Sequence, residues 1–201
     1  PKILLVDEPI VGLDPESGRV LWTVQARAGF RHNTLCAGGG RLYVIDRHSG
    51  PQADRLKKKG LKDPLPPRLL AFDLKSGREL WRIEDGVFGT WLSYSVERDL
   101  LIEAGRVARD ALVDERKGMI ARRGASGLQV WEKKSYSGPA MIHNDTIFMA
   151  DRACDLHTGA ARGRLHPLTL LPVEWIYART YGCNTPMVSE HLLTFRSGAA
   201  G

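Results

Sequence analysis

A window of eleven residues recurs along the chain and constrains its fold more than any other feature of the sequence. The clearest copy, Ala71–Trp81, has Asp73 two residues after the alanine, Gly77 four residues later and a tryptophan at its end. Most of these positions are kept in three further copies, at residues 12–22, 121–131 and 153–163. Repetition at such intervals is typical of arrays such as β-propellers. We therefore expect an all-β chain built from similar sheets.

Each window is typical of a β-hairpin seen at its turn. A short apolar run ends at the aspartate, whose carboxylate can accept hydrogen bonds from nearby backbone amides, and the glycine supplies the positive φ that such turns need. The tryptophan falls in the returning strand, where its indole can fill the space between two neighbouring sheets. One aromatic residue per sheet predicts a radial array of four-stranded blades.

The copies differ in how much of the pattern they retain. Gly12 replaces the alanine of the first copy, Arg123 replaces the aspartate of the third, and Gly163 stands where the fourth should have its tryptophan. Trp175 lies twelve residues beyond Gly163. We expect residues 162–172 to be an insertion, after which Trp175 takes the missing position.

The window resembles the tryptophan-docking motif Ala-x-Asp-x-x-x-Gly-x-x-x-Trp of the pyrroloquinoline-quinone (PQQ)-type repeat proteins, which include quinoprotein alcohol dehydrogenases and non-enzymatic propellers. All four motif positions match in Ala71–Trp81, and the resemblance extends from about residue 12 to the C-terminus. It implies an all-β, partial β-propeller of four-stranded antiparallel blades with tryptophan-docking motifs and inserted loops. It also implies an extracytoplasmic location, in the periplasm or cell envelope.

The window spacing divides the chain into expected blades. The window glycines lie 59, 50 and 32 residues apart, whereas a plain blade needs about 40 residues, so we expect insertions at residues 47–67 and 105–118. We expect one propeller domain over residues 1–201 and a chain that is a fragment, with its remaining blades elsewhere in the same protein. The expected blades are 1–28 (partial), 29–86, 87–136, 137–177 and 178–201 (partial). Binding specificity is expected in the insertions.

Charge and hydropathy narrow the classes of partner. The chain carries a net charge of +6, and a basic cluster lies between Arg55 and Lys62. A nucleic-acid footprint is one interpretation of this cluster, but the surrounding prolines favour a solvated insertion loop, so nucleic acid is not the favoured partner. No apolar run approaches the roughly 18 residues of a membrane span, and no signal peptide is visible.

The first residues also resemble a motif of a different class of protein. Residues 3–15 are similar to the Walker B strand and D-loop of ATP-binding-cassette ATPases, in which Asp7 and Glu8 would position Mg²⁺ and polarise water, and Asp14 would belong to the D-loop. The chain contains neither a Gly-x-x-x-x-Gly-Lys-Ser/Thr loop nor a Leu-Ser-Gly-Gly signature. Because the residues after Asp14 continue as a window, an ATPase fragment is a remote alternative.

The resemblance assigns no catalytic residue. Quinone-dependent dehydrogenases of this family hold their cofactor at the propeller centre with a Ca²⁺ bound by Glu and Asn, an Asp base, a stacking Trp and two adjacent cysteines. Cys36, Cys154 and Cys183 are not adjacent and show no zinc-binding spacing; one disulfide plus a thiol, or three thiols, both stay open. PQQ and Ca²⁺ are therefore implied by the resemblance alone, and no metal site is expected.

One polar segment is a weak candidate for a binding site. Its residues, with two polar neighbours further along the chain, are Arg179, Tyr181, Asn184, His191 and Arg196. An ordinary loop between blades is the favoured interpretation of this segment. The function expected from the sequence is a non-catalytic binding or scaffold module for a protein or glycan partner, as in the propeller lipoprotein that assists outer-membrane protein assembly. A fragment of a quinone-dependent dehydrogenase is the alternative.

Overall fold

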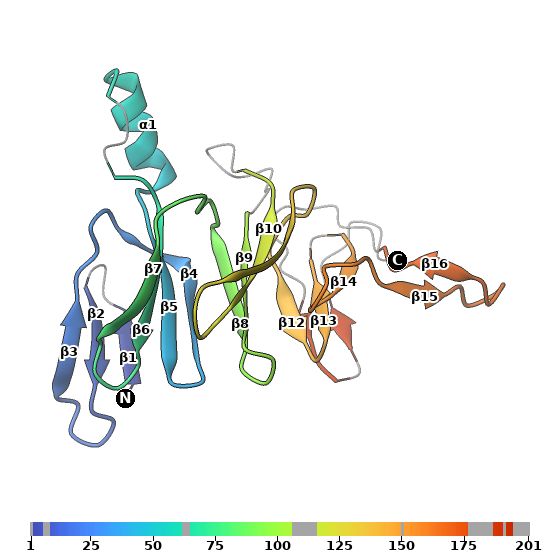
Figure 1. Cartoon of the computed structure of the whole chain (residues 1–201), viewed down its shortest axis with the longest axis horizontal. Helices are drawn as coiled ribbons and strands as arrows, with labels where there is room; N and C mark the ends of the chain where they lie inside the picture. Colours follow the sequence, from blue (N-terminus) through green and yellow to red (C-terminus); the bar gives the residue numbers. More distant parts are fainter. Residues whose placement is uncertain are drawn as a thin grey trace. The chain divides into compact units, whose positions relative to one another are not determined.

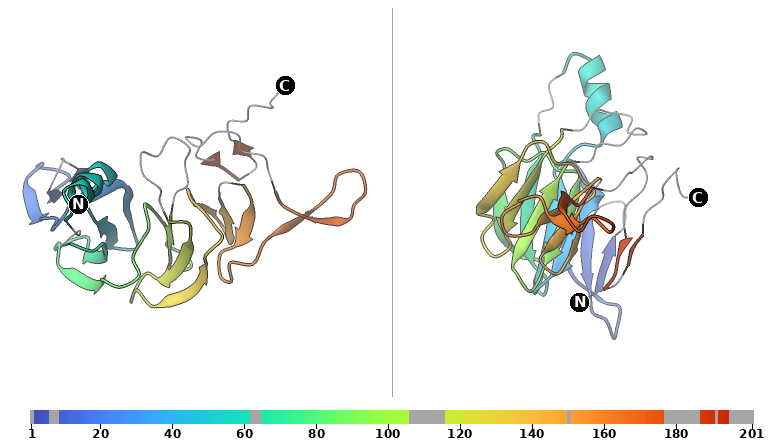
Figure 2. Two further views of the ribbon diagram at one scale, coloured as in Figure 1. Left: turned by 90° about the horizontal axis from the view of Figure 1, so that it is seen from above. Right: turned by 90° about the vertical axis from the view of Figure 1, so that its right-hand side faces the viewer.

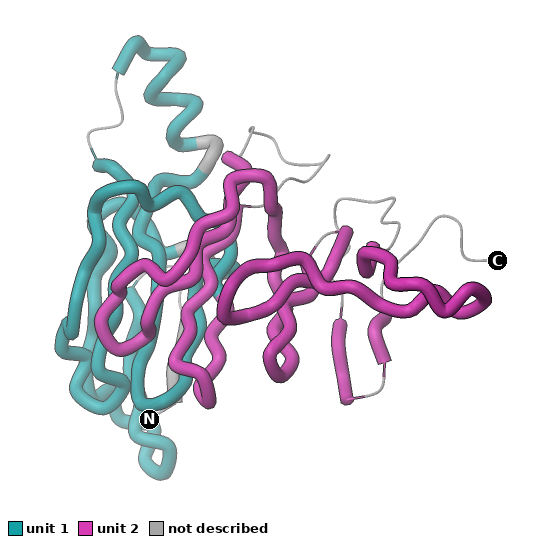
Figure 3. Tube along the Cα trace, turned by 45° about the vertical axis from the view of Figure 1, so that its right-hand side comes forward, with its two compact units in different colours: residues 1–92 teal, residues 93–201 magenta. Residues whose placement is uncertain are grey.

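The computed structural model describes most of the chain and divides it into two compact units. The described residues are 2–5, 9–61, 65–105, 116–149, 151–176, 187–190 and 192–194. One unit comprises residues 1–92 and the other residues 93–201 (Figure 3). Nearly all regular structure in the described part is β-strand, as expected for an all-β chain (Figure 1).

The first unit contains two antiparallel sheets. The three-stranded sheet has the order β1 (Lys2–Leu5), β2 (Ile10–Leu13), β3 (Val20–Val24). The four-stranded sheet has the order β4 (Phe30–Gly38), β5 (Arg41–Asp46), β6 (Arg68–Asp73), β7 (Glu79–Ile83). In the larger sheet each strand pairs with the next in the chain, which is the simple meander expected of a propeller blade.

The second unit contains a four-stranded sheet, a three-stranded sheet and two short hairpins. The four-stranded sheet, whose first strand begins at the boundary between the units, consists of β8 (Trp91–Ser95), β9 (Leu100–Ala104), β10 (Met119–Arg123) and β11 (Gln129–Lys133). The three-stranded sheet consists of β12 (Met141–His143), β13 (Thr146–Phe148) and β14 (Ala153–Asp155). The hairpins are β15 (Gly163–Leu165) with β16 (Pro172–Glu174), and β17 (Met187–Val188) with β18 (Leu193–Thr194).

The insertion between β5 and β6 is helical where the sequence analysis predicts a loop. Helix α1 (Gly50–Lys58) begins with a capping box, in which Ser49 Oγ accepts from Gln52 N and Gln52 Oε1 accepts from Ser49 N. Pro51 lies in the first turn, where proline has no intrahelical hydrogen bond to lose. The cluster of cations falls in the last turn, where the helix dipole favours it. The other expected insertion, at 105–118, lies mostly outside the described residues.

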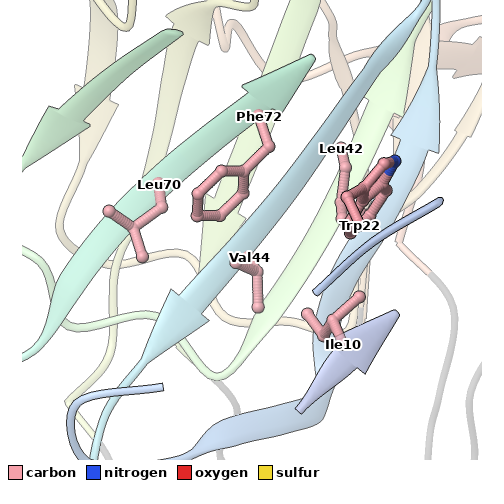
Figure 4. Close-up of a cluster of buried hydrophobic side chains, with 6 residues drawn as sticks. All are labelled: Ile10, Trp22, Leu42, Val44, Leu70 and Phe72. Carbon is pink, nitrogen blue, oxygen red and sulfur yellow. The ribbon is translucent and has the colours of Figure 1, made fainter. Parts of the chain in front are cut away.

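The core of the first unit forms between its two sheets. Ile10 and Trp22 from the three-stranded sheet pack against apolar side chains of β5 and β6 (Figure 4). The β5 and β6 side chains of this cluster are Leu42, Val44, Leu70 and Phe72. Strand β5 is buried along its length from Leu42 to Asp46, as expected for a central strand covered on both faces.

Three of the four windows close their turn with the aspartate of the window. In these three, the carboxylate accepts from amides two or three residues later: Asp14 from Glu16 and Ser17, Asp73 from Ser76, and Asp155 from His157 and Thr158. In all four, the glycine is left-handed, with φ of 71° at Gly18, 69° at Gly77, 75° at Gly127 and 65° at Gly159. The window therefore specifies one turn structure at four places in the chain.

The third window obtains its carboxylate from a neighbouring turn. Where the other windows have aspartate, this one has Arg123, and Asp99 from the turn between β8 and β9 accepts from Ala125 N at 3.1 Å instead. Ala125 is the second residue after Arg123, so its amide is equivalent to those of Glu16 and His157 in the first and fourth windows. Asp99 O also accepts from Gly124 N, and Asp99 Oδ1 accepts from the Tyr94 hydroxyl at 2.7 Å.

Two window tryptophans reach the window of the next sheet. The indole of Trp22 donates to Leu74 O at 3.2 Å, and that of Trp131 donates to Leu156 O at 3.0 Å. Leu74 and Leu156 each follow the aspartate of the next window, so the two contacts are equivalent. The indoles also lie against the next window's glycine, because an added Cβ would come within 2.7 Å of Trp22 at residue 77 and within 3.0 Å of Trp131 at residue 159.

Trp175 occupies the strand position that the fourth window lacks. Arg152 pairs with Ile176, and Ala153 N donates to Trp175 O at 3.2 Å, so Trp175 lies opposite Ala153. In the second window, Trp81 lies opposite the alanine in the same way. The expected insertion is therefore present, but it extends to Glu174 because its strands form a hairpin of their own.

Trp81 and Trp175 each take part in the same arrangement across three strands, in which an alanine lies between the tryptophan and a second aromatic residue. In the first unit, Tyr43 and Trp81 flank an alanine, with ring centroids 6.0 Å apart. In the second unit, Phe148 and Trp175 flank an alanine, with ring centroids 5.2 Å apart in an edge-to-face arrangement. This equivalence supports the assignment of Trp175 to the window position.

Candidate functional site

The polar segment that the sequence analysis singles out lies outside the described residues. This holds for all five of its candidates, Arg179, Tyr181, Asn184, His191 and Arg196. The candidate site is therefore built from the polar clusters and projecting insertions of the described part of the chain.

A polar network joins three turns along one rim of the second unit. Asp145, between β12 and β13, accepts from Arg98 Nε at 2.6 Å and from its Nη2 at 3.1 Å. His157 Nε2 lies 3.2 Å from Asp145 Oδ1. Arg98 first, and His157 after it, hold the pKa of the Asp145 carboxyl below its usual range. The network fixes the turns relative to one another and leaves its side chains partly exposed, so this rim can present polar groups to a partner.

Asp46 is a buried carboxylate that organises the chain before β4. It accepts from the backbone amides of Arg27, Ala28 and Gly29 at 2.7–2.8 Å and forms an ion pair with Arg68 at 2.8 Å. Burial by itself raises the pKa of Asp46, but the three amides and the guanidinium outweigh it and leave the pKa below its usual range. Because all these donors belong to the chain itself, Asp46 has a structural role: it holds residues 27–29 and Arg68 in place.

A buried ion pair in the β8–β11 sheet replaces an apolar pair of the β4–β7 sheet. Glu103 and Arg122 are both buried, with 3.4 Å between Arg122 Nε and Glu103 Oε2. When the windows are aligned, Glu103 takes the strand position of Val44, and Arg122 takes that of Phe72. The sequence analysis missed this pair, although the window alignment puts an arginine at the position of a core phenylalanine.

Two insertions project from the sheets and carry contrasting surfaces. Helix α1 stands beyond one end of the β4–β7 sheet, and the β15–β16 hairpin extends away from the β12–β14 sheet (Figures 1 and 2). The helix exposes four cations, Arg55, Lys57, Lys58 and Lys59. The hairpin exposes four leucines, Leu165, Leu168, Leu170 and Leu171. The sequence analysis named the basic cluster of the first insertion but not the exposed leucines of the second.

Comparison with protein families identifies the repeat. The PQQ_2 family model, described as outer membrane protein assembly factor BamB, matches residues 6–166. The chain belongs to this family. No curated protein sequence matches the chain.

Solved structures show the same fold as this BamB-family chain. BamB from Moraxella catarrhalis superposes with a TM-score of 0.58 at 17% identity, over 96% of this chain and 54% of that one. A europium-containing methanol dehydrogenase gives 0.52 at 16% identity, over 84% and 42%. The computationally designed Ika8 protein gives 0.55 at 10% identity, over 96% and 54%. The chain thus spans about half the length of these structures, and the likeness establishes a partial propeller.

Metal-ligating side chains are dispersed among the described residues of the BamB-family chain. Among them, no group of three or more His, Cys, Asp or Glu side chains is placed to hold a metal ion. Cys36 and Cys154 are thiols in different sheets, and burial raises the pKa of each to about 12. Neither thiol is set up as a nucleophile or ligand at neutral pH. No described helix is long and apolar enough to cross a membrane.

Proposed function

We propose that this chain is a non-catalytic binding or scaffold module within a larger extracytoplasmic protein. The observation that carries the proposal is the BamB family match over residues 6–166. BamB is described as an outer membrane protein assembly factor, a role that calls for contacts with other proteins. A protein partner is therefore favoured over a glycan, and the remaining blades are expected in the same protein.

The scaffold role rests on the way in which the windows join sheets. We infer that Trp22 and Trp131 act as docking elements, since each bonds to a backbone carbonyl in the next window. The blades that follow from this assignment are 1–28, 29–86, 87–136, 137–177 and 178–201. Sheets joined in this way within each unit would form a rigid base, and a rigid base positions its loops for recognition.

The inserted segments are the surfaces that such a base would present. Helix α1 leaves the sheet between its two central strands, and the β15–β16 hairpin interrupts the last strand of its blade. Neither segment is needed to complete a four-stranded meander. Their exposed charged and apolar side chains are therefore available for contacts outside the chain.

The alternative, a piece of a quinone-dependent dehydrogenase, makes a distinct experimental prediction. The intact protein is incubated with PQQ and Ca²⁺, passed through a desalting column and examined for quinone absorbance and for alcohol-dependent dye reduction. A purified methanol dehydrogenase treated in parallel is the positive control. We expect no retained quinone and no dye reduction. Stoichiometric quinone with dye reduction would overturn the scaffold proposal.

A further inference from the structure

The β15–β16 hairpin is fixed at its base and carries a turn that stands clear of the sheet. Arg162 N donates to Ala153 O and Trp175 N donates to Arg162 O, each at 2.9 Å, so the chain leaves and rejoins the blade at one point. Between these residues the hairpin extends outward, in orange (Figures 1 and 2). We call residues 165–173 the hairpin tip.

The hairpin tip is mostly apolar and is exposed, with His166 and Thr169 as its polar residues. It contains no Asp, Glu, Lys or Arg, and charged side chains occur immediately on either side, at Arg164 and Glu174. Leu168 is 88% exposed, and the other three leucines of the tip are 61–68% exposed. Contiguous apolar surface of this kind on a protein marks a contact with another apolar phase or surface.

The apolar side chains surround the tip. In the hairpin register, Leu165 pairs with Pro172 and Arg164 pairs with Val173. Because successive strand residues point to opposite faces, Leu165 lies on one face and Val173 on the other, with further leucines in the turn between them. A groove on a partner protein would cover only one face of the hairpin. A lipid phase would contact both faces, so it suits apolar side chains on both.

The N–H groups of the turn have partners within the turn. Every N–H from residue 166 to residue 171 donates within the turn, and residues 167 and 172 are prolines, which have none. The bonds are His166 to Leu171 O (2.9 Å), Leu168 and Thr169 to His166 Nδ1 (3.4 and 3.3 Å), Leu170 to His166 O (2.9 Å) and Leu171 to Thr169 Oγ1 (3.5 Å). Internal partners for these N–H groups lower the cost of moving the turn out of water.

Leu170 adds a separate indication. It has a φ of 55° and is 68% exposed, in a backbone region that disfavours bulky side chains. Glycine or asparagine would serve the turn better, and the leucine side chain is little buried by the chain itself. A contact outside the chain gives this side chain a role.

We propose that the hairpin tip inserts into the outer part of a lipid bilayer as a non-spanning membrane contact. At about 3.3 Å per residue, the tip reaches about 10 Å beyond its flanking charges, which matches the roughly 5–10 Å depth of interfacial elements. Arg164 and Glu174 would remain at the level of the headgroups. The proposal goes beyond the scaffold function and does not depend on the identity of a protein partner.

The test is flotation of the intact protein with vesicles of zwitterionic phosphatidylcholine. We expect the wild-type protein to float with the vesicles and to do so equally at low and high salt. Leu168→Gln combined with Leu170→Gly should lower the partition coefficient by about 100-fold, because each leucine withdrawn from lipid costs about tenfold. The control is Leu128→Gln, which alters a leucine of similar exposure (69%) in the turn before β11 and should float like the wild type.

Melting of the free proteins checks that the variants fold, and Leu170→Gly should melt at or above the wild-type temperature because glycine accepts a positive φ. The proposal is overturned if the wild-type protein does not float, or if the double variant floats equally well. It is also overturned if flotation needs anionic lipid and disappears when the cations of α1 are replaced. Sedimentation that shows dimers lost in the double variant, without flotation, would assign the tip to self-association instead.

Discussion

At the scale of single residues, the carboxylate that closes the window turn can belong to the window itself or to a neighbouring turn. Asp14, Asp73 and Asp155 bond to their own turns, whereas Asp99 supplies the equivalent bond to the turn after Arg123. The requirement is for an acceptor at the amides two or three residues after the window position. The residue that provides the acceptor is free to change.

A compensation experiment tests this substitution of one aspartate for another. Asp99→Gly keeps the positive φ of residue 99 and should lower the free energy of unfolding by about 1 kcal/mol. Arg123→Asp should then restore part of that loss, because it returns the carboxylate to its usual place. In the wild-type background, the same Arg123→Asp change should be neutral or unfavourable. Urea unfolding measures all four proteins, and equal effects of Arg123→Asp in both backgrounds would argue against the exchange.

Trp22 contributes to the stability of the first unit through the packing of its ring and through one hydrogen bond. Two substitutions separate these contributions. Trp22→Ala removes a buried indole and should cost about 3–5 kcal/mol. Trp22→Phe keeps most of the ring but loses the bond to Leu74 O and should cost about 1 kcal/mol. Denaturant unfolding gives both values. A negligible cost for Trp22→Ala would show that the ring does not hold the two sheets of the first unit together.

At the scale of elements, hydrogen-bonded carboxylates in the turns make the fold sensitive to acid. The amides of Ser17 and Glu16 lower the pKa of Asp14, and the hydroxyl and amide of Ser76 lower that of Asp73. Arg98 does the same for Asp145. A carboxyl with a lowered pKa stabilises the folded state fully above its unfolded value, near 3.9, and this stabilisation is lost as the pH falls through the folded value.

The urea midpoint should therefore stay level from neutral pH down to about pH 5 and fall steeply below about pH 4. Asp73→Asn should be less stable than the wild type at neutral pH, and the difference should narrow in acid, where the wild-type carboxyl also becomes neutral. A midpoint that rises on acidification, or a difference that widens, would contradict this account of the turns.

The strands were more predictable from the sequence than the inserted elements. The Gly38–Gly40 break and the apolar run after it indicate the hairpin of β4 and β5, because apolar runs and turn residues are local properties. Helix α1 was missed because its prolines suggested a loop, although Pro51 sits where a helix tolerates it. The buried Glu103–Arg122 pair and the role of Asp99 depend on pairing between strands that are distant in the sequence. Such pairings are visible only once the sheets are assembled.

At the scale of the whole molecule, one joint recurs within each unit: a window tryptophan contacts the window of the next sheet. The contact of Trp131 with Leu156 O and Gly159 is the clearest instance within one unit. Rigid joints would also hold the projecting insertions in fixed positions for their partners.

A double-mutant cycle between Trp131 and Gly159 tests the joint most directly. A Cβ at residue 159 would meet the indole at 3.0 Å, so Gly159→Ala should cost more free energy of unfolding in the wild type than in the Trp131→Ala background. The strain from the positive φ of residue 159 is present in both backgrounds and cancels in the cycle. We predict a coupling of about 1 kcal/mol between the two sites. Costs that add independently would contradict the claim that Trp131 docks on the next window.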